Sequence, residues 1–364
     1  MNVKKAEGKS EEKPMITTII PTYRRPDMLR RAIKSVLNQT YRNLQVCVYD
    51  DASGDETASV VAELQKEDSR VKYFYHPKNI GGDENYVYGM EHVDAPFFSF
   101  LADDDVLLPN FYQLAMENFN KYPDAMLFAG TTIPMSNDGR ILNRPFPSSW
   151  RRYGYYVEPT GMEEMLNGGT NKHLIWNSVL FRTDIINQIG GLDVETSPPS
   201  DSDFILRTAA HFPIVVSEEP CAIVVGHHNS LGEETSQLSV YRGWLKILEK
   251  IMNNEQLPFG ISTFATHMLL EQLEQRLFWF GIAAVIRKNF DDAEEMAKIL
   301  NNVYDLRTRS FVLHTMAKTC KHSGFLHSLL VYLNKIRVSR IQRNFQETEG
   351  KRFERYVKYL EMKK

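Results

Sequence analysis

Hydrophobic and polar positions follow two alternating periods from Met15 to about Tyr122. Short apolar runs that favour strands are each followed by a segment in which apolar residues recur every three or four positions, as on one face of a helix. The pattern predicts strands at 15–20, 44–49, 71–75 and 97–101, and helices at 26–38, 55–66, 83–90 and 109–122. Strands that alternate with helices indicate βαβ units with a parallel sheet and right-handed crossovers.

Beyond residue 122 the pattern becomes mixed. It predicts strands at 125–132, 213–216 and 222–225, a buried segment at 174–181, and helices at 183–189 and 201–211. From about Gln237 only helical periodicity remains, and glycines become rare. We therefore expect a polar, disordered leader at 1–14, an α/β domain at 15–235 and a helical domain at 236–364.

Composition narrows the class of protein. The 364 residues are 43% hydrophobic and carry a formal net charge of -3, which disfavours a nucleic-acid binder. The three cysteines are far apart, so neither a disulfide framework nor a structural zinc site is expected. The longest apolar stretch, Leu277–Ile286, is too short to cross a membrane, and no signal peptide is evident. We expect a cytoplasmic protein.

Polar side chains follow each of the first four predicted strands. The segments concerned are Pro21-Thr22-Tyr23-Arg24-Arg25, Asp50-Asp51-Ala52-Ser53-Gly54-Asp55, Asn79-Ile80-Gly81-Gly82-Asp83 and Asp103-Asp104-Asp105. Each segment alone is also typical of an ordinary turn or helix cap. Because the carboxyl ends of parallel strands meet at one edge of a sheet, where ligands bind in such folds, the four together predict a site.

The three adjacent carboxylates of this set are its most informative part. Asp103, Asp104 and Asp105 follow an apolar, aromatic strand and precede Pro109, which is suited to the first turn of a helix. Buried side by side, they repel one another and lose hydration. A divalent cation such as Mg²⁺ or Mn²⁺ removes both costs, whereas the structural alternative is stabilisation of the helix N-terminus.

These segments, in this order, resemble the inverting, nucleotide-sugar-dependent family 2 glycosyltransferases of GT-A fold. Further matching pieces are Gln39-Thr40-Tyr41, Val106-Leu107-Leu108-Pro109, Ile189-Gly190-Gly191-Leu192-Asp193 and Asp201-Ser202-Asp203-Phe204-Ile205-Leu206-Arg207. The resemblance covers about residues 15 to 232. It implies a Rossmann-like, mostly parallel sheet flanked by helices, followed here by an all-helical region. It also implies metal-dependent transfer of a sugar from a UDP-sugar to a hydroxyl of a glycan or glycolipid, in the synthesis of a surface polysaccharide or glycoconjugate.

The resemblance also implies roles for single residues. The implied donor-binding residues are Pro21, Thr22, Tyr23, Arg25, Asp50, Asp51, Gly81, Asn85, Asp103 and Asp104. Asp103, Asp105 and His227 are the implied ligands of Mn²⁺ or Mg²⁺, and Asp201 is the implied catalytic base. Ala102 stands where many relatives carry Asp, which leaves the division of roles between Asp103 and Asp104 open.

Several of these residues have a structural alternative. Tyr23 lies against the nucleobase or is a half-buried core aromatic, and Asp50 is expected to accept a hydrogen bond from the pyrimidine ring. Asp201 stands where the family has a Glu-Asp pair, here Ser200-Asp201, and otherwise serves as a helix cap. For Asp203 the structural alternative is that it orients Arg207 or the loop.

Acceptor recognition is least defined by the sequence. Trp150–Tyr153 and Asn171–Trp176 offer aromatic and basic side chains to a glycan, or simply pack, and residues 230–236 suit a mobile lid. The two rival functions are a sugar nucleotidyltransferase, which the absence of a glycine-rich loop after the first strand disfavours, and a non-catalytic binding module.

The C-terminal region is basic and amphipathic. Residues 335–364 carry ten Lys or Arg against four Glu, and Phe325–Val338 has helical amphipathicity. Such a helix lies on an anionic membrane surface, is simply solvated, or joins two copies of the chain.

Overall fold

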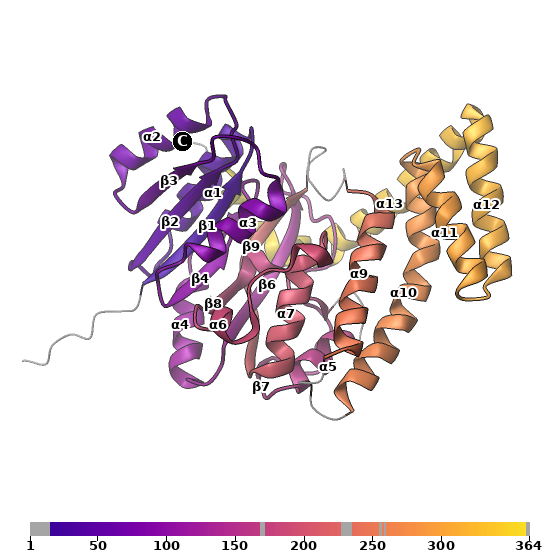
Figure 1. Cartoon of the computed structure of the whole chain (residues 1–364). Helices are drawn as coiled ribbons and strands as arrows, with labels where there is room; N and C mark the ends of the chain where they lie inside the picture. The colour runs from indigo at the N-terminus through magenta and orange to yellow at the C-terminus, as the bar shows by residue number, and fades with distance from the viewer. Residues whose placement is uncertain (1–14, 168–171, 227–234, 255–256, 258–259, 362–364) are drawn as a thin grey trace, which may run out of the picture.

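The computed structural model describes residues 15–167, 172–226, 235–254, 257 and 260–361. In it a mixed β-sheet flanked by helices is followed by an arm of long helices (Figure 1). This confirms the predicted α/β fold with a helical C-terminal region. No helix in the described part of the chain is long and apolar enough to span a membrane.

The first four strands form the parallel part of the sheet, in the order β3-β2-β1-β4. The strands are β1 (Ile16–Thr22), β2 (Leu44–Asp50), β3 (Val71–Tyr75) and β4 (Phe97–Phe100), and the connecting helices are α1 (Pro26–Leu37), α2 (Thr57–Glu67) and α3 (Gly82–Glu91). Each lies within two residues of its predicted bounds. Thr22 pairs with Asp50, and Asp50 with Tyr75, so these strand ends are level and the segments after them meet at one edge.

The remaining strands make the sheet mixed. They are β5 (Val106–Leu107), β6 (Leu127–Ser136), β7 (Gly154–Tyr156), β8 (Val179–Arg182) and β9 (Ile214–Gly226). β8 lies antiparallel between β4 and β6, β9 runs parallel to β6, and β5 and β7 pair antiparallel with β9. The helical elements of this region are α4 (Phe111–Lys121), α5 (Thr160–Leu166), η2 (Trp176–Ser178), α6 (Ile185–Ile189), η3 (Val194–Thr196) and α7 (Ser200–His211).

The strand β9 differs most from its prediction. Two strands were expected at 213–216 and 222–225, because polar residues 217–219 interrupt the apolar alternation between them. The structure has a single strand, β9, whose pairing with β6 shifts register around Thr131, opposite Pro220. This irregularity in the pairing accommodates the exposed polar residues 218 and 219, so that the strand continues through them.

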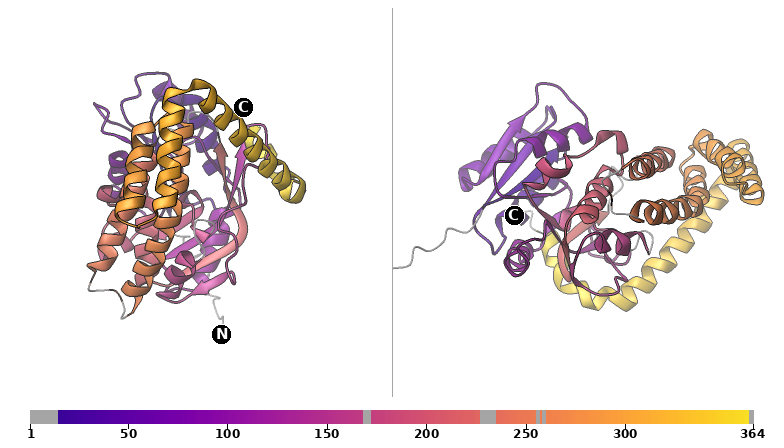
Figure 2. Two further views of the ribbon diagram at one scale, coloured as in Figure 1. Left: turned by 90° about the vertical axis from the view of Figure 1, so that its right-hand side faces the viewer. Right: turned by 60° about the horizontal axis from the view of Figure 1, so that its bottom comes forward.

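The helical arm starts at α9 and returns to the sheet through its last long helix. It comprises α9 (Gln237–Met252), α10 (Ile261–Ile286), α11 (Phe290–Asn302), α12 (Arg307–His322), α13 (Gly324–Phe353) and η4 (Glu354–Glu361). Figure 2 shows α13 running from the tip of the arm back to the sheet. There Phe353 and Leu360 share a buried cluster with Val106 of β5 and Ile223 and Val225 of β9.

The first helices of the arm share a core with the sheet region. Leu238, Tyr241 and Trp244 of α9 belong to the same buried cluster as Phe204 and Leu206 of α7. The core is therefore continuous between the sheet region, whose last strand is β9, and the helical arm, which begins with α9.

Gly243 sets how closely α9 approaches the segment that leads into α7. A Cβ atom at this position would lie 2.6 Å from the carbonyl oxygen of Thr196 and 2.9 Å from that of Ser197. Backbone oxygens cannot move aside as a side-chain end can. The absence of a side chain at Gly243 therefore allows α9 to pack closely against the segment that precedes α7.

We predict that Gly243→Ala destabilises the protein by about 1–3 kcal/mol in urea unfolding, despite the higher helix propensity of alanine. Gly324→Ala is the matched control, since a Cβ there meets nothing within 4 Å. The control should be neutral or slightly stabilising. Equal stability of the two variants would contradict the steric account.

Candidate functional site

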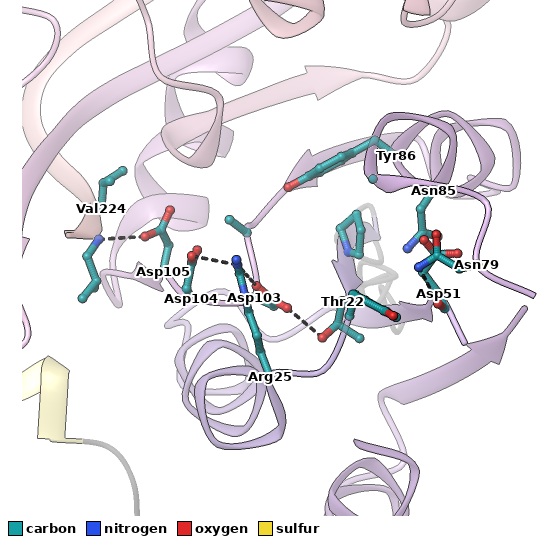
Figure 3. Close-up of a pocket in the computed structure, with 15 residues that line it drawn as sticks. Thr22, Arg25, Asp51, Asn79, Asn85, Tyr86, Asp103, Asp104, Asp105 and Val224 are labelled. Atoms are coloured by element: carbon teal, nitrogen blue, oxygen red, sulfur yellow. Dashed lines mark hydrogen bonds and ion pairs between the residues drawn. The ribbon is translucent and has the colours of Figure 1, made fainter. Parts of the chain in front are cut away.

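A pocket of about 610 Å³ opens at the carboxyl ends of the parallel strands, where the sequence predicted a site (Figure 3). Its walls come from the ends of β1 and β2, the start of α3, the segment after β4 and the end of β9. The lining residues are Pro21, Thr22, Tyr23, Arg25, Asp51, Asn79, Gly82, Asn85, Tyr86, Ala102, Asp103, Asp104, Asp105, Val224 and Val225.

Two of the three adjacent carboxylates share one arginine. The Nη1 atom of Arg25 lies 3.2 Å from Oδ1 of Asp103 and 3.0 Å from Oδ2 of Asp104, and Thr22 donates a hydrogen bond of 2.7 Å to Asp103 (Figure 3). Burial, with the negative charge of Asp104, still raises the pKa of Asp103 to about 6. The guanidinium of Arg25 therefore only partly offsets the cost of burying the Asp103 carboxylate.

Asp105 is held differently from its neighbours. Its Oδ1 accepts a hydrogen bond of 2.7 Å from the Val225 amide, and its Oδ2 accepts one of 2.5 Å from the Asn177 side chain. Burial raises the pKa of Asp105 above its usual range. Both oxygens are thus engaged by protein donors that tie β9 and η2 to the acidic segment.

The predicted metal ligands are only partly brought together. No three His, Cys, Asp or Glu side chains among the residues described are arranged to hold a metal ion. Asp103 and Asp104 do line the pocket, and carboxylates are the hard oxygen donors that Mg²⁺ and Mn²⁺ prefer. Their chemistry fits such an ion, with Arg25 as their present cationic partner. His227 lies outside the described residues.

The paired aspartates after β2 have separate positions. Asp51 lines the pocket and accepts hydrogen bonds from the amides of Ile80 (2.6 Å) and Gly81 (3.0 Å). Asp50 does not belong to the lining residues. Its buried carboxylate accepts hydrogen bonds from the Ser53 amide and the Tyr73 hydroxyl.

Asp50, which was expected to contact a base, is thus buried outside the pocket lining, whereas Asp51 belongs to it. Asp51 is the carboxylate at this wall, because the strand carries adjacent side chains to opposite faces. Gly81, at φ 98°, anchors the loop to Asp51, and Asn85 reaches the pocket while donating a hydrogen bond of 2.9 Å to the Tyr49 carbonyl.

Tyr23 lies at the rim of the pocket rather than in the core. Its side chain is 41% exposed, and the guanidinium of Arg24 lies 4.9 Å from its ring centroid. Pro21 and Thr22, which precede it, line the wall. An exposed ring at a pocket mouth is free to stack on a planar group.

Tyr86 was not among the predicted site residues, yet it lines the pocket opposite the acidic residues (Figure 3). Its ring packs against Trp176 and Phe100, with centroid distances of 4.7 and 5.6 Å. Burial raises the pKa of the Tyr86 hydroxyl well above its usual value, and the negative charges of Asp103–Asp105 and Asp201 raise it further. The hydroxyl therefore stays protonated and can donate a hydrogen bond. Only a helical pattern marked this position.

Asp201 lies in the first turn of α7 and is not among the lining residues, although its charge acts on Tyr86. Its Oδ1 accepts a hydrogen bond of 2.6 Å from the Ser202 amide, and burial raises the pKa of its carboxyl. Asp203 has the structural role considered for it. It forms an ion pair of 2.8 Å with Arg207, which donates to the carbonyls of Ile189 and Gly191.

The segments considered for acceptor binding are mostly occupied in packing. Trp150 is buried and donates a hydrogen bond of 2.9 Å to the Lys172 carbonyl, while Trp176 stacks on Phe100. The residues expected to form a lid lie outside the described part of the chain, except Thr235 and Ser236. Ser236 caps α9.

Comparisons with known proteins relate the chain to glycosyltransferases. Residues 17–189 match the model of glycosyl transferase family 2. Over 109 residues the chain is 39% identical to the GalNAc(5)-diNAcBac-PP-undecaprenol beta-1,3-glucosyltransferase of Campylobacter jejuni, a match that covers 30% of this chain and 35% of that protein. An uncharacterized glycosyltransferase of Haemophilus influenzae is 33% identical over 94 residues, or 26% of this chain and 38% of the relative. The matched region thus spans little more than a third of either relative.

Solved structures show the same fold. S. aureus TarS in complex with UDP-GlcNAc superposes with a TM-score of 0.59 at 14% identity, covering 85% of this chain and 92% of that chain. The mannosyltransferase PcManGT from Pyrobaculum calidifontis, in complex with GDP-Man and Mn²⁺, gives 0.52 at 14% identity and covers 89% of both chains. Both likenesses include much of the helical region.

We predict that Asp103→Asn stabilises the fold at pH 8 by about 1–2 kcal/mol, because it removes a buried charge. The raised pKa means that the folded protein binds this proton more tightly than the unfolded chain does. The cost of the charge is therefore greatest above pH about 6 and disappears as the pH falls toward the ordinary value of about 4. Urea unfolding at both ends of this range measures the difference.

Asp68→Asn is a control of opposite sign. Its hydrogen bonds with Arg70 lower the pKa of Asp68, so its removal should destabilise the protein at pH 8. If Asp103→Asn also destabilises at pH 8, the Arg25 pair outweighs the burial cost and the assignment fails.

Proposed function

We propose that the chain, whose residues 17–189 match the model of glycosyl transferase family 2, transfers a sugar from a UDP-sugar to a hydroxyl of a glycan or glycolipid acceptor, with inversion at the anomeric carbon. The observation that carries this proposal is one pocket in which Asp51 and the Asp103–Asp105 cluster lie on facing walls, with Asp201 near its side. Such a pocket accommodates a nucleotide along its length and leaves the sugar end beside a carboxylate.

Each part of the nucleotide-sugar donor is matched to the pocket wall whose side chains suit it chemically. Tyr23 offers an exposed ring to a base, and Asp51 offers a carboxylate to its ring N–H groups. Arg25, between Asp103 and Asp104, supplies a positive charge near the diphosphate. The complex of S. aureus TarS with UDP-GlcNAc favours a uridine nucleotide, whereas that of PcManGT with GDP-Man makes guanosine the competitor to test.

A divalent cation fits the same wall. We propose that Asp103 and Asp104 hold Mn²⁺ or Mg²⁺, while Asp105, whose oxygens are engaged by Val225 and Asn177, positions the segment that carries them. When bound, such an ion neutralises negative charge that develops on the leaving diphosphate. The Tyr86 hydroxyl, held protonated on the wall opposite these carboxylates, donates a hydrogen bond to an oxygen atom of the bound nucleotide sugar.

Asp201 is proposed as the general base. An acceptor hydroxyl that attacks the anomeric carbon must lose its proton, and a positioned carboxylate accepts it. Burial raises the pKa of Asp201, which makes its carboxylate a stronger base than an exposed one. The Ser202 amide, bonded to Oδ1, leaves Oδ2 for the acceptor.

We predict that Asp201→Asn lowers the rate of sugar transfer about 10²–10⁴-fold and leaves UDP binding within about twofold, because the amide cannot accept the proton. Radiolabelled transfer and isothermal titration measure the two quantities. Asp193→Asn is a control carboxylate, engaged by Lys250 outside the pocket. In the wild type, transfer should fall as the pH drops through the raised pKa of Asp201. Normal transfer by Asp201→Asn would refute the assignment.

We predict that Asp51→Ala weakens UDP binding about tenfold or more, measured by titration with UDP, GDP and dTDP in the presence of Mn²⁺. Asp55→Ala is the control, because Asp55 follows the same strand and its carboxylate accepts hydrogen bonds from Thr57 at the start of α2. Binding of UDP without any transfer would favour the non-catalytic module. Absence of all nucleotide binding by the folded wild type would overturn the proposal.

A further inference from the structure

A long stretch of the helical arm carries positive charge only. Residues 306–346, which span α12 and most of α13, contain eight Lys or Arg and no Asp or Glu. Because the whole chain has a net charge of -3, the rest of it is acidic. The charge is thus strongly separated along the sequence, with the positive part on the arm.

The exposed side of α13 is apolar along its first half. Phe325, Leu329, Tyr332 and Ile336 follow one another at spacings of three or four residues, which places them on one helix face. Their exposed fractions are 76%, 42%, 60% and 45%. The opposite face packs inward, with His327 buried. This helix therefore turns its apolar side away from the protein, the reverse of an ordinary surface helix.

Basic residues continue and flank this strip. Arg340 and Arg343 extend the same face by one and two turns, and Lys335 and Arg337 lie beside it. The guanidinium of Arg337 also lies 5.9 Å from the ring centroid of Trp279, a residue of α10 that is 57% exposed. In Figure 2, α13 runs along the edge of the molecule with its outer side uncovered by other described segments.

We propose that α13 is a membrane-docking helix that lies in the surface of an anionic lipid bilayer. The strip defined by Phe325, Leu329, Tyr332 and Ile336 enters the boundary between headgroups and acyl chains, and Lys335, Arg337, Arg340 and Arg343 contact lipid phosphates. A helix of this kind binds through buried apolar area together with attraction to anionic lipids. The inference is independent of the proposed transfer activity.

The charges favour lipid over a second copy of the chain. A self-complementary dimer through this strip would bring two strongly basic helices together, which like-charge repulsion opposes. An anionic bilayer instead complements both the apolar strip and the charges beside it. Trp279 adds an aromatic ring of the type that settles at the level of the headgroups.

The test is flotation of the full-length protein with vesicles of equal parts phosphatidylglycerol and phosphatidylcholine, and with vesicles of phosphatidylcholine alone. The wild type should bind the anionic vesicles, and binding should weaken with added salt. Phe325→Ser/Tyr332→Ser/Ile336→Ser and Arg340→Gln/Arg343→Gln should each lower binding about tenfold or more. Circular dichroism and urea unfolding establish that the variants fold.

Val157→Ser/Met252→Ser removes two equally exposed apolar residues elsewhere, and Arg140→Gln removes an exposed arginine of the sheet region. These controls should bind vesicles like the wild type. Failure of the folded wild type to bind anionic vesicles would overturn the proposal. So would equal binding to both vesicle types, or a wild-type dimer that the apolar variant converts to monomer without any change in lipid binding.

Discussion

The constraint on which the site depends is the burial of adjacent negative charges at the end of a strand. Three carboxylates emerge together where β4 ends, and each needs its own compensation. Arg25 and Thr22, from the end of β1 and the start of α1, supply it for Asp103. Asn177 and the backbone of β9 supply it for Asp105. Elements far apart in the sequence are thus drawn to one point by the need to satisfy these charges.

The mixed part of the sheet supplies two of these compensating donors. β8 runs antiparallel beside β4, and β9 pairs antiparallel with β5, the short strand directly after the acidic segment. The Val225 amide that bonds Asp105 belongs to β9, and the Asn177 side chain directly precedes β8. The fold therefore supplies fixed donors where water would otherwise have to solvate the charge.

Much of this could be predicted from the sequence, for identifiable reasons. The βαβ units were predictable because apolar periodicity reports burial directly. The pocket was predictable because strand ends must meet at one edge of a parallel sheet. The sequence could not tell which of Asp50 and Asp51 lines the pocket, because this depends on which face of the strand each side chain occupies. Tyr86 and Asn177 were not predicted, because their roles arise from contacts between segments distant in the sequence, which leave no local pattern.

The attachment of α13 links two ends of the molecule that the sequence keeps apart. Its last turn, through Phe353, packs in the cluster that contains Val106 and Val225. Val106 follows Asp105 directly, and Val225 is its hydrogen-bond donor. The C-terminal end of α13 therefore packs next to the acidic segment, and its N-terminal end lies at the tip of the arm. A contact that holds α13 in one orientation would therefore also orient the pocket, because the end of α13 packs against residues next to Asp105.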